Sequence, residues 1–555
     1  MTSPPRLSYF HNVGKDPLRA LTIGYLLEIT ADKYPNQEAI ISAEQNQRLT
    51  YQELIEAADK FAAGLNALGI KKGDRLGIWA PNLVEWYVIY LACARAGILM
   101  VAINPGSQAQ EIEFCINKVG IKIIVCPYKG KYQNYYDILS KIIPELKSVE
   151  TRKIANDQVS SLERIVIISE EKLGGTFQYK EVLGYANENN ISRIQNIQHL
   201  IQPDDACLIQ FSSGTTGQPK AAVISHFQVV NAGYEIGKRS GLNQKHHKIC
   251  VQVPFFHVFG TSVSLISALN FGSTIVVGSP TYNPRENLKA IKNEGCTSVY
   301  GTPTMFIDLI TMQKQLKLDI SIEYALTGGA PCSPETFKQI RQVLNAKKVK
   351  SIYGLTEVSA VAFQSLMSDA EEFKLDLTVG YLAEHLEAKV VDEDNNILPI
   401  NTPGELCIRG YCVMLGYWNE EEKTKEVIGA DGWFRTGDKF VLQDDGYGMN
   451  IGRLKDVIIR GGENIYPKEV EDVLDTHPDI IESQVVGLRH ERLGEEVCAC
   501  VRLRSGTTVT EESLIAYCKG KIPFSKIPSK IRIVKEFPKT TSGKIKKYQL
   551  VKQFQ

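Results

Sequence analysis

The feature that most constrains the fold is a short run of glycine and hydroxyl residues that ends in a lysine and lies between two apolar segments. It reads Phe-Ser-Ser-Gly-Thr-Thr-Gly-Gln-Pro-Lys over residues 211–220. The flanking segments 207–211 and 221–226 are largely apolar, so we predict two strands joined by a tight loop rather than a linker between domains. Glycines let a backbone approach a ligand closely, and hydroxyl and ammonium groups bind phosphate oxygens. The stretch therefore predicts a phosphate-binding loop.

The spacing within this loop excludes the Walker A motif, in which the lysine directly follows a glycine. Here Gln218 and Pro219 separate Gly217 from Lys220. The expected phosphate contacts come from the hydroxyls, the glycines and the lysine of the loop, namely Ser212, Ser213, Gly214, Thr215, Thr216, Gly217 and Lys220.

The charge balance limits the partners of this chain. It has 555 residues, with 63 basic and 63 acidic side chains, whereas a protein that binds nucleic acid usually carries a basic face. Zero net charge therefore favours small-molecule substrates over nucleic acid and confines phosphate binding to a local site. The length exceeds what one hydrophobic core can hold and predicts about three or four packing units. No pattern in the sequence indicates an oligomeric state.

The cysteines and the N-terminus bear on the compartment. The 12 cysteines form no Cys-x-x-Cys pair, which favours a reducing environment. Residues 1–7 lack the apolar core of a secretory signal and the arginines of an amphipathic presequence, so we expect a cytoplasmic protein. The apolar run 86–103 contains Arg95, and a charge in the middle of a membrane span is costly. We expect this run to form a buried helix and a buried strand, and we predict no transmembrane segment.

Apolar runs alternate with helical patterns over most of the chain. Thr50 and Glu53 form a capping box that opens a helix, and Gly69 ends its periodic apolar face. Short apolar runs predict strands at 76–80, 121–126, 164–168, 273–277, 296–300 and 324–326. The alternation predicts an α/β fold of stacked mixed sheets, mostly parallel, with covering helices on both faces. The more polar segment 128–202 is expected to be an insertion that crosses the surface.

The sequence pattern changes beyond residue 404. Short strands at 405–410 and 433–438 predict a small β-unit. A break near 452–456 is followed by about 100 residues, which is the size of a separate α+β domain. The expected organisation is a large N-terminal domain, 1–453, that includes the β-unit, and a small mobile C-terminal domain, 454–555.

Five spaced motifs together resemble a known superfamily. In chain order they are the loop at 212–220, Tyr353-Gly354-Leu355-Thr356-Glu357, Thr436-Gly437-Asp438, Gly452-Arg453-Leu454-Lys455-Asp456 and Ser542-Gly543-Lys544. This order resembles the acyl-adenylate-forming (AMP-dependent) synthetase superfamily, and the resemblance covers nearly the whole chain. Residues 401–418 are similar to the group of medium-chain acyl-CoA synthetases called family member 2.

The resemblance implies an AMP-forming acid–thiol ligase that uses ATP, Mg²⁺ and CoA. A fatty acid of medium chain length would be activated to acyl-AMP with release of pyrophosphate, and CoA would then take the acyl group and release AMP. Because a fold does not fix a substrate, an aryl-acid CoA ligase and a luciferase-like adenylating oxygenase stay open as alternatives. Residues 358–360 differ from those of the medium-chain group, which leaves the chain length open. The mitochondrial matrix is the alternative compartment that the resemblance implies.

A catalytically inactive lipid-binding protein is a further alternative. The chain disfavours it, because it retains the charged residues that the resemblance assigns to the reaction, which are Lys220, Glu357, Asp438, Arg453 and Lys544.

The resemblance also assigns roles in the first step. It places catalysis on Lys544, Lys220, His257 and Glu357, and the metal on Glu357 and Thr215. Asp438 and Arg453 would bind the ribose after a β-hairpin brings them together. The adenine and the remaining nucleotide atoms would lie against Gly329, Ala330, Pro331, Tyr353, Gly354 and Thr356, with the ring of Tyr353 stacked on the base.

For the second step the resemblance implies a rotation of the C-terminal domain about Lys455. The rotated domain would line the path of CoA with Gly461, Gly462 and Glu463. The acyl chain would lie between the segments 258–271 and 302–307, in which no basic residue occurs.

Overall fold

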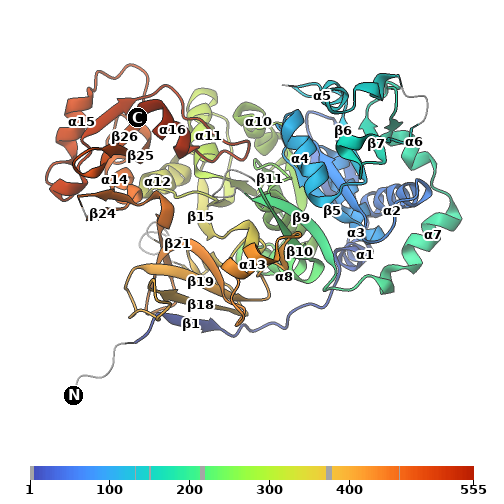
Figure 1. Cartoon of the computed structure of the whole chain (residues 1–555), viewed down its shortest axis with the longest axis horizontal. Coiled ribbons are helices and arrows are strands. Elements are labelled where there is room, and N and C mark those ends of the chain that lie inside the picture. Colours follow the sequence, from blue (N-terminus) through green and yellow to red (C-terminus); the bar gives the residue numbers. More distant parts are fainter. Residues whose placement is uncertain (1–5, 132, 149–151, 213–218, 370–377, 462) are drawn as a thin grey trace.

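The computed structural model describes residues 6–131, 133–148, 152–212, 219–369, 378–461 and 463–555. Within these ranges the strands form four sheets. Figure 1 shows two of them in the large body, a third sheet below, and a small C-terminal body, coloured orange to red, at one end of the molecule. This arrangement confirms the predicted α/β class with stacked mixed sheets and a small α+β unit at the C-terminus.

The first large sheet has eight strands. Its inner strands run parallel and consist of continuous apolar runs, as expected for strands that are buried on both faces. In spatial order the strands are β20 (Gly416–Tyr417), β10 (Lys220–Ser225), β9 (Ala206–Ser212), β5 (Leu99–Ile103), β4 (Arg75–Trp79), β6 (Ile123–Pro127), β7 (Arg164–Ile168) and β8 (Phe177–Gln178).

The second large sheet has nine strands and is parallel at its centre and antiparallel at both edges. In spatial order the strands are β17 (Tyr381–Leu382), β16 (Phe363–Gln364), β15 (Ala346–Tyr353), β14 (Ile322–Gly328), β13 (Ser298–Gly301), β11 (Lys248–Val251), β12 (Thr274–Val277), β2 (Glu38–Ser42) and β3 (Gln47–Thr50).

Helices fill the space between the two large sheets and cover their outer faces. The largest apolar core joins side chains of both sheets to helices of the central layer, which are α1 (Ile23–Lys33), α2 (Tyr51–Ala67), α3 (Val84–Ala96), α8 (His226–Arg239) and α9 (Ser267–Phe271). Thr50 and Glu53 form the predicted capping box of α2. The outer faces pack against α4 (Ala109–Val119) and α5 (Tyr135–Ile142) on one sheet, and α10 (Pro284–Glu294), α11 (Pro303–Leu316) and α12 (Pro334–Val343) on the other.

The two smaller sheets follow in the sequence. The antiparallel sheet that contains the predicted β-unit consists of β1 (Tyr9–Asn12), β18 (Leu386–Val391), β19 (Gly404–Gly410), β21 (Phe434–Leu442) and β22 (Gly448–Arg453), and α13 (Glu421–Val427) lies between its strands in the chain. The C-terminal body consists of β24 (Glu463–Ile465), β23 (Ile458–Arg460), β26 (Gly494–Leu503), β25 (Ile480–His490), β27 (Lys530–Ile533), α14 (Pro467–Leu474), α15 (Glu511–Cys518) and α16 (Lys547–Phe554).

The segment 128–202 differs from the expected surface insertion. Its strands β7 and β8 form the edge of the eight-stranded sheet, and Leu139 and Leu146 are fully buried in the core beneath it. Two further helices of this segment, α6 (Tyr179–Gly184) and α7 (Glu188–Asn196), contact α2. The expectation was wrong because many exposed polar residues surround a smaller number of strongly apolar positions that fill the core.

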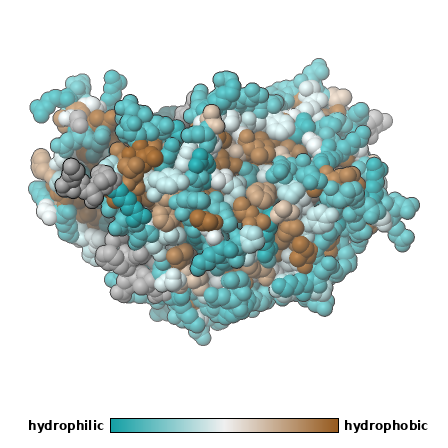
Figure 2. All heavy atoms as spheres, turned by 90° about the horizontal axis from the view of Figure 1, so that it is seen from below, coloured by the Kyte–Doolittle hydropathy of each residue, from teal (hydrophilic) through white to brown (hydrophobic). Residues whose placement is uncertain are grey.

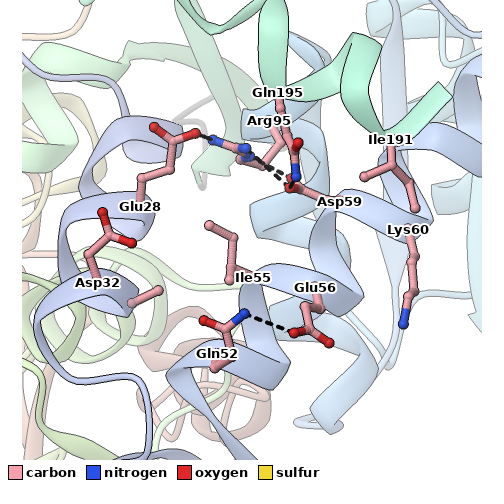
Figure 3. Close-up of a pocket in the computed structure, with 11 residues that line it drawn as sticks. Glu28, Asp32, Gln52, Ile55, Glu56, Asp59, Lys60, Arg95, Ile191 and Gln195 are labelled. Atoms are coloured by element: carbon pink, nitrogen blue, oxygen red, sulfur yellow. Dashed lines mark hydrogen bonds and ion pairs between the residues drawn. The ribbon is translucent and has the colours of Figure 1, made fainter. Parts of the chain in front are cut away.

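Arg95 lies in the predicted buried helix, α3, and is 1% exposed. Its Nε is 2.6 Å from Oδ1 of Asp59 on α2, and its Nη1 pairs with Glu28 on α1. Figure 3 shows these three side chains converging at a hollow of about 470 Å³ that is rimmed by acidic side chains. The buried guanidinium is thus fully paired, and the pairs tie α3 to both neighbouring helices.

No helix in the described part of the chain combines the length and the apolar character that crossing a bilayer needs. On the face drawn in Figure 2, apolar residues form separate small groups among hydrophilic ones.

Candidate active site

The two strands that flank the phosphate loop form as predicted. β9 and β10 pair in antiparallel fashion, with Ser212 opposite Lys220. The second strand ends at Ser225 rather than at His226, because the Ser225 side chain accepts a bond from Gln228 and caps α8. The loop residues Ser213, Gly214, Thr215, Thr216 and Gly217 lie outside the described residues, so their predicted contacts stay predictions.

Glu357 lies at the centre of a hydrogen-bonded cluster in the large body. Its Oε1 accepts bonds from Oγ of Ser212 at 2.7 Å and from the hydroxyl of Tyr417 at 3.1 Å. The ammonium of Lys220 lies over the Tyr417 ring, 4.9 Å from the ring centroid. Tyr417 therefore positions both the carboxylate and the lysine that the sequence assigned to phosphate chemistry.

The chain reaches Glu357 through an unusual backbone. β15 ends at Tyr353, and Glu357 lies in a single 3-10 turn, Thr356–Val358. Ser359 and Ala360 after it have φ of 53° and 108°, which side chains other than glycine rarely adopt. A Cβ at Gly354 would lie 1.9 Å from the carbonyl oxygen of Ala360, so only glycine fits there. Such strain is typical of functional sites.

Asp438 and Arg453 meet across a hairpin, as predicted. They are opposite residues of β21 and β22, and Nε of Arg453 is 2.8 Å from Oδ1 of Asp438. The Tyr353 hydroxyl donates to Oδ2 of Asp438 at 2.6 Å. Burial raises the pKa of Asp438, while Arg453 and the bond from Tyr353 act in the opposite direction. The sequence did not predict this hydrogen bond between Tyr353 and Asp438.

His257 and Gly329 form the side of the site that faces the C-terminal body. Gly329 follows β14 with φ of 79°, ahead of Ala330 and Pro331. The Cε of Lys544 is 3.5 Å from the position that a Cβ on Gly329 would occupy. Burial and the nearby Lys544 ammonium lower the pKa of His257 to about 3, so its imidazole is neutral at physiological pH.

Lys544 is the one predicted catalytic residue that the C-terminal body contributes. Burial and the positive charge of Arg453 lower its pKa, while Glu357 and Asp438 attract its charge. The structure thus brings Lys544 to the same place as the large-body residues His257, Glu357 and Asp438. Each of these side chains is far from the others in the sequence.

The residues predicted for CoA lie elsewhere in this arrangement. Gly461, which follows β23, and Glu463, the first residue of β24, are exposed, and Gly462 lies outside the described residues. Lys455 is in a 3-10 turn, Leu454–Asp456, that links β22 to β23. It therefore lies between the last strand of the large body and the first strand of the small one.

The segments predicted for the acyl chain are buried. Residues 258–271 form a π-helix, η4 (Phe259–Ile266), followed by α9, and every residue of the π-helix is buried. The segment 302–307 opens α11, with Thr302 as its N-cap. π-Helical turns are rare and occur mostly near functional sites.

Sequence reasoning missed the contact of Tyr417 with Glu357 and Lys220. The signal was available, since Tyr417 lies within the stretch 401–418 that carried the resemblance, but nothing local links it to Glu357. Ser212 donates to Glu357 in this structure, and its expected contact with phosphate stays a prediction.

The surroundings of Glu357 fit a hydrated magnesium ion. Both hydrogen bonds to its carboxylate end on Oε1, so no donor from the described residues occupies Oε2. Mg²⁺ is usually held by one or two carboxylates, with waters and phosphate oxygens as the remaining ligands. The described residues contain no cluster of three His, Cys, Asp or Glu side chains that could hold a metal ion.

Two protein-family models match the chain. One, described as AMP-binding enzyme, covers residues 27–418, and the other, described as AMP-binding enzyme C-terminal domain, covers residues 469–544. A curated relative from Danio rerio, named medium-chain acyl-CoA ligase ACSF2, mitochondrial, is 43% identical over 98% of this chain and 90% of its own length.

Solved structures agree with the fold. The anthranilate CoA ligase AuaEII in complex with anthranoyl-AMP has a TM-score of 0.84 at 22% identity, with 97% of this chain and 98% of that one covered. ATP-bound MatB from Rhodopseudomonas palustris has a TM-score of 0.80 at 25% identity, with 96% and 99% covered. The apo form of the same protein has a TM-score of 0.72, with the same shares of the two chains covered. This chain therefore lies closer to the ATP-bound arrangement.

Proposed function

This chain belongs to the AMP-binding enzyme family, and we propose that it is a fatty acid–CoA ligase that works through an acyl-AMP intermediate. The observation that carries the proposal is the position of Lys544 of the small body beside Gly329 of the large body, within electrostatic reach of Glu357, Asp438 and His257. The relative named medium-chain acyl-CoA ligase, at 43% identity over nearly the whole chain, supports a fatty acid of medium chain length as the substrate.

In the first step a carboxylate oxygen attacks the α-phosphorus of ATP, and the bond to the departing pyrophosphate breaks. Two anions must meet, so the site has to supply positive charge where the transition state develops negative charge. Lys544 and Lys220, which is held over the Tyr417 ring, are the groups proposed to supply this charge. The neutral imidazole of His257 is proposed to donate a hydrogen bond to the substrate without adding positive charge to the site.

Magnesium, when bound at Glu357 with a hydroxyl of the loop such as Thr215, neutralises phosphate charge and orients pyrophosphate for departure. Ser212 and Tyr417 fix the carboxylate for this task. The glycine and hydroxyl residues from Ser213 to Gly217 are proposed to bind the phosphate oxygens.

The nucleoside is bound by the hairpin and by β15. Tyr353 and Arg453 orient the Asp438 carboxylate. This carboxylate accepts hydrogen bonds from the ribose hydroxyls. The adenine lies between the Tyr353 ring and the backbone of residues 329–331, and Gly354 and Thr356 complete this wall.

In the second step the CoA sulfur attacks the acyl carbonyl carbon, and the bond to AMP breaks. The thiol needs access to a face that Lys544 covers, so the body 454–555 turns about Lys455 relative to the body 1–453. The turn carries Lys544 away and brings Gly461, Gly462 and Glu463 to the CoA path.

A panel of acids tests this function. We expect CoA-dependent release of AMP with unbranched acids of four to eighteen carbons, because no basic residue occurs in the segments 258–271 and 302–307. We expect the highest rate at intermediate length, because the relative is named a medium-chain ligase. Highest rates with aromatic acids would favour the aryl-acid ligase instead. Absence of pyrophosphate exchange into ATP with every acid would contradict the ligase and support the inactive lipid-binding protein.

The compartment is a separate proposal. The relative from Danio rerio is named as mitochondrial, and we infer the same compartment for this chain in its native cell. Fractionation followed by detection of the protein tests it, and recovery in the cytosolic fraction alone would support the cytoplasmic expectation instead.

A further inference from the structure

The small body docks on the large one along α11. Thr304 and Asp308 lie one turn apart and therefore on the same side of this helix. They meet Glu482 of β25, Arg502 of β26 and Lys539, all from the small body. Figure 1 shows α11 beside the C-terminal body. We call this group of four charged side chains and Thr304 the α11 contact.

The contacts join two carboxylates to two cations. Nη2 of Arg502 is 3.6 Å from Oδ1 of Asp308 and 3.4 Å from Oε2 of Glu482. Nζ of Lys539 is 3.7 Å from Oδ2 of Asp308. The hydroxyl of Thr304 donates to Oε1 of Glu482 at 3.3 Å. Each carboxylate thus has a partner from the other body.

Asp308 depends on the small body more than Glu482 does. Glu482 has Arg502 within its own body, whereas both ion pairs of Asp308 among the described residues cross to the other body. The Asp308 side chain is 27% exposed and Arg502 is 17% exposed. If the bodies separated, Asp308 would lose both cations at once, so its charge favours the docked state.

The α11 contact is linked to Lys544 by a tight turn. Lys539 pairs with Ile545 in an isolated bridge, and the Thr540 amide donates to the Lys544 carbonyl at 2.7 Å. The Lys544 amide donates in return to the hydroxyl of Thr540 at 3.0 Å. Gly543 of the same turn lies against the Thr302 side chain at the start of α11. Fixing Lys539 on Asp308 therefore fixes Lys544.

We propose that Asp308 is a positioning residue for adenylate formation, which holds Lys544 in the site through Lys539 and Arg502. This role rests on the proposed function. The two ion pairs that cross between the bodies, at 3.6 and 3.7 Å and with partial exposure, are weak, so the contact stabilises the docked state without preventing its release for the second step. Asp308 biases the docking equilibrium and touches no substrate.

Separate assays of the two steps test the role of Asp308. With Asp308→Asn, acid-dependent exchange of pyrophosphate into ATP should slow roughly twofold to fivefold, while conversion of synthetic acyl-AMP plus CoA to thioester should not slow. Asp308→Glu should restore most of the exchange, because it retains the charge. The matched control is Glu511→Gln, which removes a carboxylate paired with Arg532 inside the small body at 3.0 Å and should leave both steps unchanged.

Three results would overturn the proposal: equal slowing of both steps by Asp308→Asn, no change in either, or the same loss of exchange with Glu511→Gln. A parent protein that is inactive in both assays with every acid would overturn the proposed function and this role together. An active parent with an unaffected Asp308→Asn would overturn the role alone.

Discussion

Arg95 in the large body and Arg502 at the edge of the small body each pair with two carboxylates, but under different conditions. Nε of Arg95 is 2.6 Å from Asp59, and the side chain is 1% exposed. Nη2 of Arg502 is 3.4 Å from Glu482 and 3.6 Å from Asp308, with 17% exposure. A short, buried ion pair is costly to break, whereas a longer, partly exposed ion pair separates easily. This difference supports the proposal that the large body is a fixed frame and that the small body docks and releases.

The largest effect is expected from breaking the fixed pair. Asp59→Ala leaves Arg95 buried without its main partner and should lower the free energy of unfolding by about 3–5 kcal/mol, measured by denaturant unfolding of the large body. Asp308→Ala, at the releasable contact, should lower it by about 1 kcal/mol or less. Equal losses for the two variants would contradict the distinction between frame and docking contact.

Lys544→Ala removes the ammonium group that docking of the small body brings into the site. An ammonium aimed at developing charge in an enclosed site is comparable to an oxyanion-hole donor, whose loss costs about 10²-fold to 10³-fold in rate. We expect that loss in adenylate formation from acid and ATP, and a near-parental rate of thioester formation from synthetic acyl-AMP and CoA. Collapse of both rates would show that Lys544 serves the fold or the CoA site.

Tyr417→Phe tests the fixed half of the site. It removes the bond to Glu357 but keeps the ring beneath Lys220. A hydrogen bond to a charged group contributes about 1.5–3 kcal/mol, so adenylate formation should fall roughly tenfold to a hundredfold, with a higher requirement for Mg²⁺. Tyr90→Phe is the control, because its buried hydroxyl has no hydrogen-bond partner among the described residues. A parental rate for Tyr417→Phe would show that Ser212 alone positions Glu357.

A smaller effect concerns the pH dependence of the stability of the large body. Burial lowers the pKa of His226, in the large body, to about 4, and its Nδ1 accepts from the Ile23 amide at 3.2 Å. Between that value and the ordinary pKa, only the unfolded chain binds the proton, so stability is lost as pH falls below about 6.5. By pH 5 this costs about 2 kcal/mol.

His226→Gln keeps an acceptor for Ile23 and removes the titration. Its melting temperature should therefore fall less between pH 7 and pH 5 than that of the parent. An identical fall in both proteins would mean that other groups dominate the acid response.

Prediction from sequence succeeded where the structure is local. The strand at 164–168 and the pairing of Asp438 with Arg453 depend on short apolar runs and one hairpin. It failed for the segment 128–202, where polar residues outnumber the few apolar side chains that enter the core. The placement of Tyr417 on Glu357 and of Lys539 on Asp308 could not be predicted, because these contacts form between remote parts of the chain. The assigned roles of the site residues stay predictions.

The most direct test of a fixed frame with a releasable body is a distance measurement between spin labels. One label is attached to Phe524→Cys in the small body, a position that is 83% exposed. The other is attached to Ile29→Cys in the large body, a position that is 49% exposed. A control pair joins Ile29→Cys to Leu200→Cys, 54% exposed and also in the large body. Eleven of the twelve native cysteines are buried, and the partly exposed Cys332 is replaced by serine.

The two ligand states to compare are a non-hydrolysable ATP analogue, and a stable acyl-AMP analogue with CoA. We predict that the distance between the bodies differs in these two states, while the control distance stays constant. An unchanged distance between the bodies would contradict the account, as would a change of the same size in the control pair.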